Sequence, residues 1–415
     1  MPSGLTKGWP DIRQEDRDAL LRVLDRGILG GAYAPEAVAL ANEFATYLGC
    51  RYCLALNSGT AALHCAIAAA GVQPGDEVIT SALSFVATPL SALQHGAIPV
   101  FVDIEPRTFN LDVTQIESKI NERTRALIPV HLHGLPADMD EVNHIAEKHD
   151  LVVIEDAAQA HGAVYKGRNV GTLGHMAAFS LHYSKNLPAG EGGLFVADEE
   201  VYFERADMLR LFGERARPDE PRSYMAFGMG WNYRIPELSA ALARSQLARL
   251  EEYNAIGQRN AEYLTRELRE IRGLELPYAP PDRIHVYHKY RVRLHPEVLG
   301  ISIRATEFRD RLLAALQAEG VAASLWQTIP LPGQPLFQRK EGFGDAYPWA
   351  LTPHGRQMEY DLNDYPEAMK LLENSIVVAS DAHPLYAQNF ELMAYYEHAF
   401  RKVFDQIEAV VRASG

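Results

Sequence analysis

Short apolar runs alternate with helical patterns between residues 50 and 200. The apolar runs cover residues 52–56, 77–82, 98–104, 126–130, 151–157, 177–181 and 192–197. They are apolar at successive positions rather than at every second one, which is typical of strands buried on both faces. Two stretches between them, 60–71 and 89–96, have helical composition and end at a glycine, a common helix stop. This alternation predicts an α/β fold with a mostly parallel central sheet flanked by helices.

The pattern changes after residue 230. Residues 236–271 form a long amphipathic helical stretch without a strand signal, which we expect to link two domains. Further on, the chain reads as strand (286–294), helix (304–320) and final helix (391–413), which suits a smaller α+β domain.

We therefore expect a large domain over residues 1–250, including an N-terminal helix, and a small C-terminal domain over residues 251–415. Within the small domain, residues 330–366 are rich in Pro, Gly, aromatic and charged residues. A loop of this length is more often functional or partly disordered than idle.

Composition and charge exclude several classes of protein. Hydrophobic residues make up 47% and charged residues 23% of the 415 positions, as in an ordinary globular protein. The 40 basic and 54 acidic residues give a net charge of −14, and no basic run suggests a nucleic-acid or membrane surface. No signal peptide and no apolar stretch of about 18 residues is found, so we expect a cytoplasmic protein without a membrane partner.

A possible metal or redox motif is Cys50-x-x-Cys53. It lacks a second Cys pair or a His pair to complete a zinc site. We therefore predict no metal.

A lysine stands between a buried strand and a glycine-dense turn, in the segment SLHYSKNLPAGEGG that starts at Ser180. In a desolvated pocket, Lys185 would favour its neutral form, form an imine with a carbonyl and later act as a general base. The glycines let backbone approach a bulky ligand. Taken alone, such a lysine is more often a surface residue near a turn.

An acid ends the apolar strand VVIED, at Asp156. Ligands of open α/β sheets bind at the carboxyl ends of strands. Pyridoxal 5′-phosphate (PLP) acts as an electron sink while its ring nitrogen is protonated, and a buried carboxylate keeps that proton in place. Asp156 could instead cap the next helix. Because Lys185 lies one strand–turn–strand unit further on, the cofactor interpretation is favoured.

Small residues lead into an apolar helix at Asn57–Thr60. The free N–H groups and positive dipole end of such a helix form a natural phosphate site. Many helices begin with Ser or Thr, so this signal alone is weak. The glycine motifs of dinucleotide and nucleoside triphosphate sites are missing from the sequence.

Six motifs in order, SGTAAL, SFVAT, EDAAQAHGA, FSLHYSKN, GEGG and GWNYR, resemble the DegT/DnrJ/StrS family of fold-type I PLP enzymes, the sugar and cyclitol aminotransferases. The resemblance runs from about residue 10 to 255. It implies PLP as the cofactor and a ping-pong transfer of an amino group, from glutamate or glutamine to a keto sugar or keto cyclitol. Such a reaction belongs to the biosynthesis of an amino sugar or aminocyclitol natural product, for example an antibiotic.

The resemblance also implies individual roles. Lys185 is the Schiff-base lysine and Asp156 the partner of the pyridine nitrogen. The other implied cofactor contacts are Gln159 on the 3′-hydroxyl side, Ser58, Gly59, Thr60 and Ser180 at the phosphate, Phe85 stacked on the ring, and Asn232 at the phosphate of the neighbouring subunit. The contact from Asn232 implies a homodimer with shared active sites.

Three further residues are candidates for substrate contacts. His161 and His182 fall near the expected pocket, although a histidine on a packed face is often a core residue. Arg234 could grip a donor carboxylate, or could be a structural ion-pair partner. Past residue 280 the resemblance weakens, and the region from Trp326 to Trp349 is more similar to the cyclitol and aminohydroxybenzoate branch than to the nucleotide-sugar branch.

Three alternatives compete with transamination. Dehydratases of the same family have histidine in place of the lysine, so Lys185 favours transamination. Enzymes that make aminohydroxybenzoate keep the lysine and catalyse an aromatising elimination, so the sequence does not exclude them. A non-catalytic PLP-binding protein would have no need to retain Lys185, Asp156 and Ser180 together.

Overall fold

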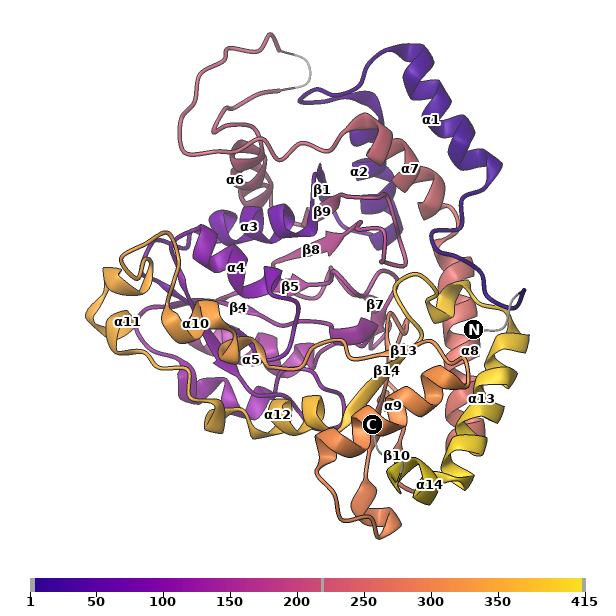
Figure 1. The fold of residues 1–415 in the computed structure, drawn as a ribbon. Coiled ribbons are helices and arrows are strands. Elements are labelled where there is room, and N and C mark those ends of the chain that lie inside the picture. The colour runs from indigo at the N-terminus through magenta and orange to yellow at the C-terminus, as the bar shows by residue number, and fades with distance from the viewer. Residues whose placement is uncertain (1–3, 218–219, 413–415) are drawn as a thin grey trace.

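The computed structural model describes residues 4–217 and 220–412, and its centre is a seven-stranded sheet (Figure 1). In spatial order the strands are β1 (Tyr52–Leu56), β9 (Gly193–Ala197), β8 (Met176–Ser180), β5 (Val152–Asp156), β4 (Thr124–Ile128), β2 (Glu77–Ser81) and β3 (Ile98–Val102). Strand β9 runs antiparallel to both neighbours, and the other pairs are parallel. The predicted α/β fold with a mostly parallel sheet is confirmed.

Helices cover both faces of this sheet (Figure 1). One face packs against α2 (Pro35–Leu48), α5 (Met139–His149) and α7 (Glu237–Leu247), and the other against α3 (Gly59–Ala69), α4 (Ala87–Gln94) and α6 (Glu200–Arg210). Neighbouring strand residues belong to opposite cores, as Val153 and Ile154 do. Because both faces are buried, successive strand positions must be apolar. Helix α1 (Gln14–Arg26) packs on the outside of α7.

The C-terminal part of the chain forms a second core around a four-stranded antiparallel sheet. Its strands in spatial order are β10 (Leu274–Glu275), β12 (Tyr290–Leu294), β14 (Ser375–Val378) and β13 (Ala323–Ser324), and its helices are α8 (Leu250–Leu268), α9 (Ala305–Ala318), α13 (Phe390–Asp405) and α14 (Ile407–Arg412). A small sheet of β11 (Arg283–Ile284), β6 (Val164–Tyr165) and β7 (Arg168–Asn169) pairs the two halves of the chain.

The long helical stretch predicted over residues 236–271 is two helices. Helix α7 ends at Leu247 and packs in the core of the large sheet, whereas α8 starts at Leu250 and packs in the C-terminal core. The break lies where we expect one domain to end and the next to begin. The domain limits themselves stay a prediction.

Residues 330–366 pack at the β3 edge of the large sheet, away from α8 and α13 (Figure 1). This segment holds the short helices α10 (Pro335–Arg339) and α11 (Pro353–Gln357), and α12 (Pro366–Glu373) follows. Trp349 is fully buried, and its indole N–H donates to the Tyr360 hydroxyl at 2.9 Å. Tyr360 in turn donates to the carbonyl of Pro99 on β3, at 2.8 Å. The segment is a packed cover on the end of the large sheet.

None of the described helices is long and apolar enough to cross a lipid bilayer.

Candidate active site

A cavity of about 400 Å³ opens where the parallel strands β5 and β8 end. Ligands of α/β folds bind at such carboxyl edges, because the loops that leave the strands converge there. The predicted site residues that line this cavity are Ser58, Gly59, Thr60, Phe85, Asp156, Gln159, Ser180, His182 and Lys185. The fold therefore collects residues from four separate stretches of the sequence around one space.

Asp156 is the last residue of β5 and is 5% exposed. Its carboxylate accepts hydrogen bonds from the Thr88 hydroxyl at 2.6 Å and from the Ala158 backbone N–H at 3.1 Å. Burial raises the pKa of Asp156, while these two donors and the charge of Lys185 oppose the rise by favouring the carboxylate. The acid is thus buried, oriented and open to the cavity.

Lys185 follows β8 in the glycine-dense turn. Burial, together with the nearby positive charge of Lys289, lowers its pKa to about 8, against the opposing charges of Asp156 and Asp381. Near neutral pH the amine is therefore close to its titration point, which suits both nucleophilic attack and proton transfer. The Trp9 indole N–H donates to the carbonyl of Lys185 at 3.1 Å and fixes the turn from the N-terminal segment.

The start of helix α3 faces the same cavity. Ser58 is its N-cap, and the Ser58 hydroxyl accepts from the Ala61 backbone N–H at 3.0 Å. A β-carbon at Gly59 would lie 2.8 Å from the β-carbon of Ser180, so glycine is required for this close approach. Because the first N–H groups of a helix have no partner within it, they are available to an anionic group. The residues present therefore fit a phosphate-bearing cofactor: the helix start would hold the phosphate, and Asp156 and Lys185 would be available to the rest of the group.

The profile of the DegT/DnrJ/EryC1/StrS aminotransferase family matches residues 10–359. The chain belongs to this family. It is thus an enzyme of the aminotransferase class, which confirms the family and the enzyme class expected from the motifs.

Two relatives and one solved structure illustrate the range of the family. The chain is 39% identical over 323 residues, 76% of each chain, to a protein of Streptoalloteichus tenebrarius provisionally named L-glutamine:3-amino-2,3-dideoxy-scyllo-inosose aminotransferase. It is 36% identical over 368 residues, 87% of this chain and 89% of the relative, to dTDP-3-amino-3,4,6-trideoxy-alpha-D-glucose transaminase of Streptomyces venezuelae. The structure of 3-amino-5-hydroxybenzoic acid synthase superposes with a TM-score of 0.83 at 27% identity, covering 97% of this chain and 99% of that one. The named functions of these proteins include both a cyclitol and a nucleotide-sugar transamination.

The family motif EDAAQAHGA contains His161, which lies in the core and not on the cavity wall. It is fully buried, and its Nδ1 pairs with the side-chain oxygen of Asn186 at 3.0 Å. Asn254 and Asn186 both donate to the carbonyl of His161. Burial, together with the charge of Lys185, lowers the pKa of His161 to about 3, so the ring is neutral. In this chain, His161 supports the turn next to Lys185 rather than facing the cavity.

His182 does line the cavity, and it lies near a second polar residue of the wall. Its Nδ1 pairs with the Ser184 hydroxyl at 2.8 Å, and its Nε2 lies 3.8 Å from a carboxylate oxygen of Glu191. Burial lowers its pKa, so the ring is neutral at neutral pH. His182 can thus exchange hydrogen bonds with a ligand.

The family motif GWNYR places Asn232 and Arg234 outside the cavity of their own chain. Their side chains bond to each other, from the Arg234 Nε to the Asn232 Oδ1 at 3.0 Å. The Arg234 guanidinium also stacks over Phe212, 5.4 Å from the ring centroid. Arg234 is therefore free of any ligand contact in a single subunit.

Several cavity residues escaped the sequence reasoning, among them Glu191 and four residues with a common origin. His288, Lys289, Trp326 and Asp381 all come from the C-terminal part of the chain. The Lys289 ammonium lies 2.6 Å from the Asp381 carboxylate. Residues 286–294 were predicted to form a strand, but the sequence pattern around His288 and Lys289 does not indicate that their side chains face a ligand. Thr88 was also missed, although it ends the quoted motif SFVAT.

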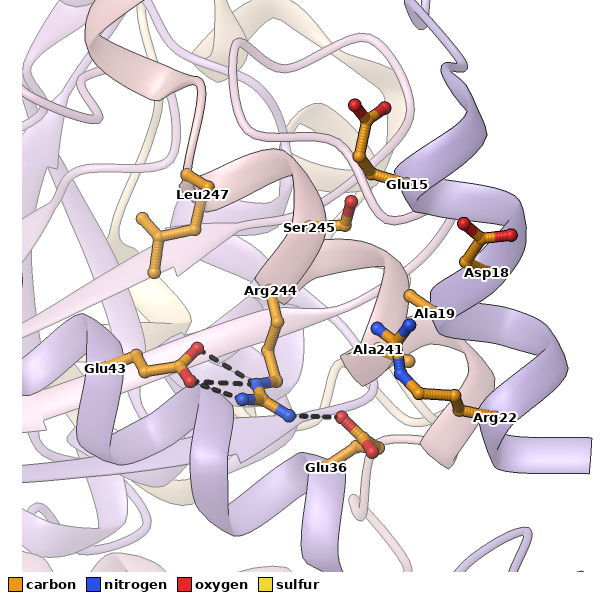
Figure 2. A pocket seen from close by; sticks show the side chains of 11 residues that line it. Glu15, Asp18, Ala19, Arg22, Glu36, Glu43, Ala241, Arg244, Ser245 and Leu247 are labelled. Atoms are coloured by element: carbon orange, nitrogen blue, oxygen red, sulfur yellow. Dashed lines mark hydrogen bonds and ion pairs between the residues drawn. The ribbon is translucent and has the colours of Figure 1, made fainter. Parts of the chain in front are cut away.

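A second cavity, of about 590 Å³, lies between α1, α2 and α7 and has different chemistry (Figure 2). Figure 2 shows Arg244 of α7 paired with Glu36 and Glu43 of α2, while Glu15 and Arg22 project from α1. Four acids and two arginines line this cavity, so its wall carries a net negative charge, and it lacks the Lys185 and Asp156 chemistry. The first cavity is therefore the candidate active site.

Within residues 4–217 and 220–412, no group of three or more His, Cys, Asp or Glu side chains is arranged to hold a metal ion. Cys50 and Cys53 are free thiols, and burial raises the pKa of both.

Proposed function

We propose that this chain is a PLP-dependent aminotransferase that moves an amino group from glutamate or glutamine to a keto sugar or keto cyclitol. One observation carries the proposal: Lys185 and Asp156 open onto the cavity that also receives the N-terminus of α3. The family membership and the functions named for its relatives support the same chemistry.

Each residue then has a physical task. When bound, PLP supplies an electron sink for the charge left on the substrate carbon after a proton departs. Lys185, with a pKa of about 8, would accept that proton and hold it for the next transfer. Asp156 would keep the proton on the ring nitrogen, because a buried negative charge beside that nitrogen favours its protonated form. Phe85, which is 58% exposed and lines the cavity, covers one face of the ring.

The rest of the wall suits a polyhydroxylated ring. Glu191 and Asp381 offer carboxylate oxygens to hydroxyl donors, Lys289 offers an ammonium to hydroxyl acceptors, and Trp326 offers an apolar face. Both signs of charge are present, so the site does not select strongly for an anionic ring. This wall supports a sugar or cyclitol acceptor without distinguishing between them.

The first experiment locates the cofactor-bearing amine. Purified protein reconstituted with PLP is treated with borohydride and mapped by peptide mass spectrometry, with Lys185→Ala and Lys289→Ala as matched variants. The label should sit on the peptide that contains Lys185 and persist in Lys289→Ala, because both lysines line the cavity but only Lys185 is expected to carry the cofactor. A label on Lys289 in the unmodified protein would overturn the assignment.

The second experiment tests the reaction. Glutamate and glutamine are added to the holoenzyme, and keto sugars and keto cyclitols are then screened for return of the original cofactor absorbance and for an aminated product. An aromatic product from a cyclic keto acid, without net amine transfer, would favour the alternative of a 3-amino-5-hydroxybenzoic acid synthase-like enzyme, which the structural likeness keeps open. Binding of PLP without any amine exchange would indicate a non-catalytic protein.

We further propose a homodimer with shared sites, in which Asn232 reaches the phosphate in the partner's cavity. Asn232 is exposed and lies off its own cavity. The neighbouring loop also exposes large apolar side chains, with Tyr224 74%, Phe227 55% and Met229 77% accessible. Exposed apolar groups of this number are typical of a contact surface.

Mixed dimers test this arrangement. Lys185→Ala and Asn232→Ala are each expected to be impaired, because one lacks the amine and the other has a weaker phosphate grip. When co-expressed, mixed dimers should hold one doubly defective and one intact site, and activity should recover to about half per mixed dimer. If subunit exchange is shown independently and activity does not exceed the sum of the two variants, the sites are not shared.

A further inference from the structure

Arg291 on β12 is a buried cation without an acid beside it. It is 2% exposed. Its Nε donates to the Nε2 of His133 at 3.0 Å, and one terminal nitrogen donates to the Ser375 hydroxyl at 2.7 Å. The other terminal nitrogen, Nη2, is buried and has no hydrogen-bond partner within the described part of the chain. An unpaired buried charge is costly, so proteins normally give it a counter-ion.

His133 adds a second unsatisfied donor. Because its Nε2 accepts from Arg291, the ring proton of the neutral histidine is on Nδ1, and that atom is buried without a partner among residues 4–217 and 220–412. The residue is 3% exposed and its backbone has a φ of 59°, in the left-handed region that residues other than glycine rarely adopt. Strain of this kind is kept where the surrounding structure uses the residue.

Both side chains line a narrow cleft of about 10 Å³, which has room for one water molecule or one monatomic ion. Arg107, His285 and Lys289 also line it, and no carboxylate is found among its described lining residues. Lys289 already has its acid, Asp381, at 2.6 Å. The charge of Arg291 is therefore not balanced from within the cleft.

Another buried arginine on the same strand shows the usual solution. Arg293 is 6% exposed and lies 3.6 Å from the carboxylate of Glu275. Arg291, two residues earlier, is buried even more fully and has no such acid among the described residues. This contrast indicates that the missing counter-ion of Arg291 comes from outside the chain.

We propose that the cleft between Arg291 and His133 binds a small monovalent inorganic anion, of which chloride is the natural probe. A water molecule could satisfy the two free donors, but it would leave the guanidinium charge uncompensated. The side chain of Trp326, with its ring 5.8 Å from the Arg291 guanidinium carbon, lines the main cavity. Among their described lining residues, the cleft and the main cavity share Lys289 alone, so we assign the ligand as a free ion rather than a carboxylate of a substrate in the main cavity.

The anion site touches the wall of the active site. The backbone N–H of His133 donates to the side-chain oxygen of Gln159 at 2.8 Å, and the His133 ring packs edge-on against Trp326 at 5.1 Å. Both Gln159 and Trp326 line the main cavity. An anion that holds Arg291 and His133 in place thus stabilises two residues of the active-site wall.

The test measures anion binding directly on the purified protein. The melting temperature is followed as chloride replaces gluconate at constant ionic strength, for the unmodified protein, Arg291→Met and the matched control Arg293→Met. Chloride should raise the melting temperature with a saturable dependence in the unmodified protein and in Arg293→Met, and not in Arg291→Met. A chloride effect that persists in Arg291→Met, or that does not saturate, would refute the site.

A second measurement does not depend on how the variants fold. Crystals of the unmodified protein grown in bromide should show an anomalous peak within hydrogen-bond distance of the Arg291 Nη2 and the His133 Nδ1. A cleft that holds only an ordered water, or a bromide peak only in the main cavity, would overturn the proposal.

Discussion

The hydrogen bond from the Thr88 hydroxyl lowers the pKa of Asp156 and so favours its ionised form. Replacing Thr88 with valine isolates that effect. The Thr88 Oγ1 lies 2.6 Å from the Asp156 carboxylate, 2.8 Å from the Ser84 hydroxyl and 3.1 Å from the carbonyl of Phe85. A hydroxyl has one proton, and a buried carboxylate is the strongest of these acceptors, so Thr88 donates to Asp156 and accepts from Ser84. Valine keeps the shape and removes the donor.

The expected magnitude follows from that single bond. A hydrogen bond to a charged group contributes about 1.5–3 kcal/mol. At about 1.4 kcal/mol for each pKa unit, its loss raises the pKa of Asp156 by about one to two units. Burial already raises this pKa, and Thr88 is the largest of the contributions that lower it. Thr88→Val therefore adds to the existing shift.

The sign of the pH dependence is fixed by the direction of the shift. Because the pKa of Asp156 is higher in the folded than in the unfolded state, the folded protein binds the extra proton and loses stability as pH rises between those two values. Thr88→Val extends this window upward. In cofactor-free protein at acid pH, the variant and the unmodified protein should have similar free energies of unfolding. Once Asp156 is ionised in both, the variant should be less stable by about 1.5–3 kcal/mol.

The assay is urea unfolding of cofactor-free protein across pH, together with carboxyl-carbon NMR titration of Asp156. Thr88→Ser restores the hydroxyl and should return both the stability and the pKa toward the starting values. Ser84→Ala, which leaves the donor to Asp156 in place, should have a smaller effect. A loss of stability that is the same at every pH, with an unchanged pKa of Asp156, would mean that Thr88 acts through packing alone.

Two substitutions and one titration give further predictions. Gly59→Ala should weaken cofactor binding by about tenfold or more, about 1.4 kcal/mol, because its β-carbon would meet the β-carbon of Ser180 at 2.8 Å. Fluorescence titration measures the affinity for the cofactor, and an unchanged affinity would contradict the close approach. In cofactor-free protein, the rate of amine labelling of Lys185 should titrate with a midpoint near pH 8. Because its pKa is lower in the folded than in the unfolded state, the protein should gain stability as pH rises from about 8 toward the unfolded value of about 10.4. A labelling midpoint at the unfolded value would exclude desolvation of the amine. Glu155→Gln should lower the free energy of unfolding in urea by about 3 kcal/mol or more, because the buried carboxylate accepts from three backbone N–H groups and pairs with His131. A loss under about 1 kcal/mol would show that the amide can take the place of the carboxylate.

Much of the cavity wall was predictable because its residues lie next to strand ends. Asp156 ends an apolar run, and Ser58 and Lys185 each follow one. In a parallel sheet the carboxyl ends of the strands meet at one edge, so local patterns place these side chains together without knowledge of the packing. The same regularity explains why the mostly parallel sheet was predicted correctly.

His161 shows where local reasoning stops. It is two residues beyond Gln159, which lines the cavity, yet its own ring points into the core. Sequence proximity to a site residue does not say which way the loop turns after the strand. That direction depends on Asn186 and Asn254, which hold the loop from distant segments.

The sequence by itself determined the order of strands and helices, the buried character of the sheet and the residue types at its carboxyl edge, because burial and hydrogen bonding leave a periodic record in each segment. The tertiary structure alone decided that Lys289, Trp326 and Asp381 close the cavity from the C-terminal part, that residues 330–366 cover the far end of the large sheet, and that Arg291 lies buried without an acid. These features join segments more than a hundred residues apart. Their side chains meet through the packing of one core against another, which no local pattern encodes.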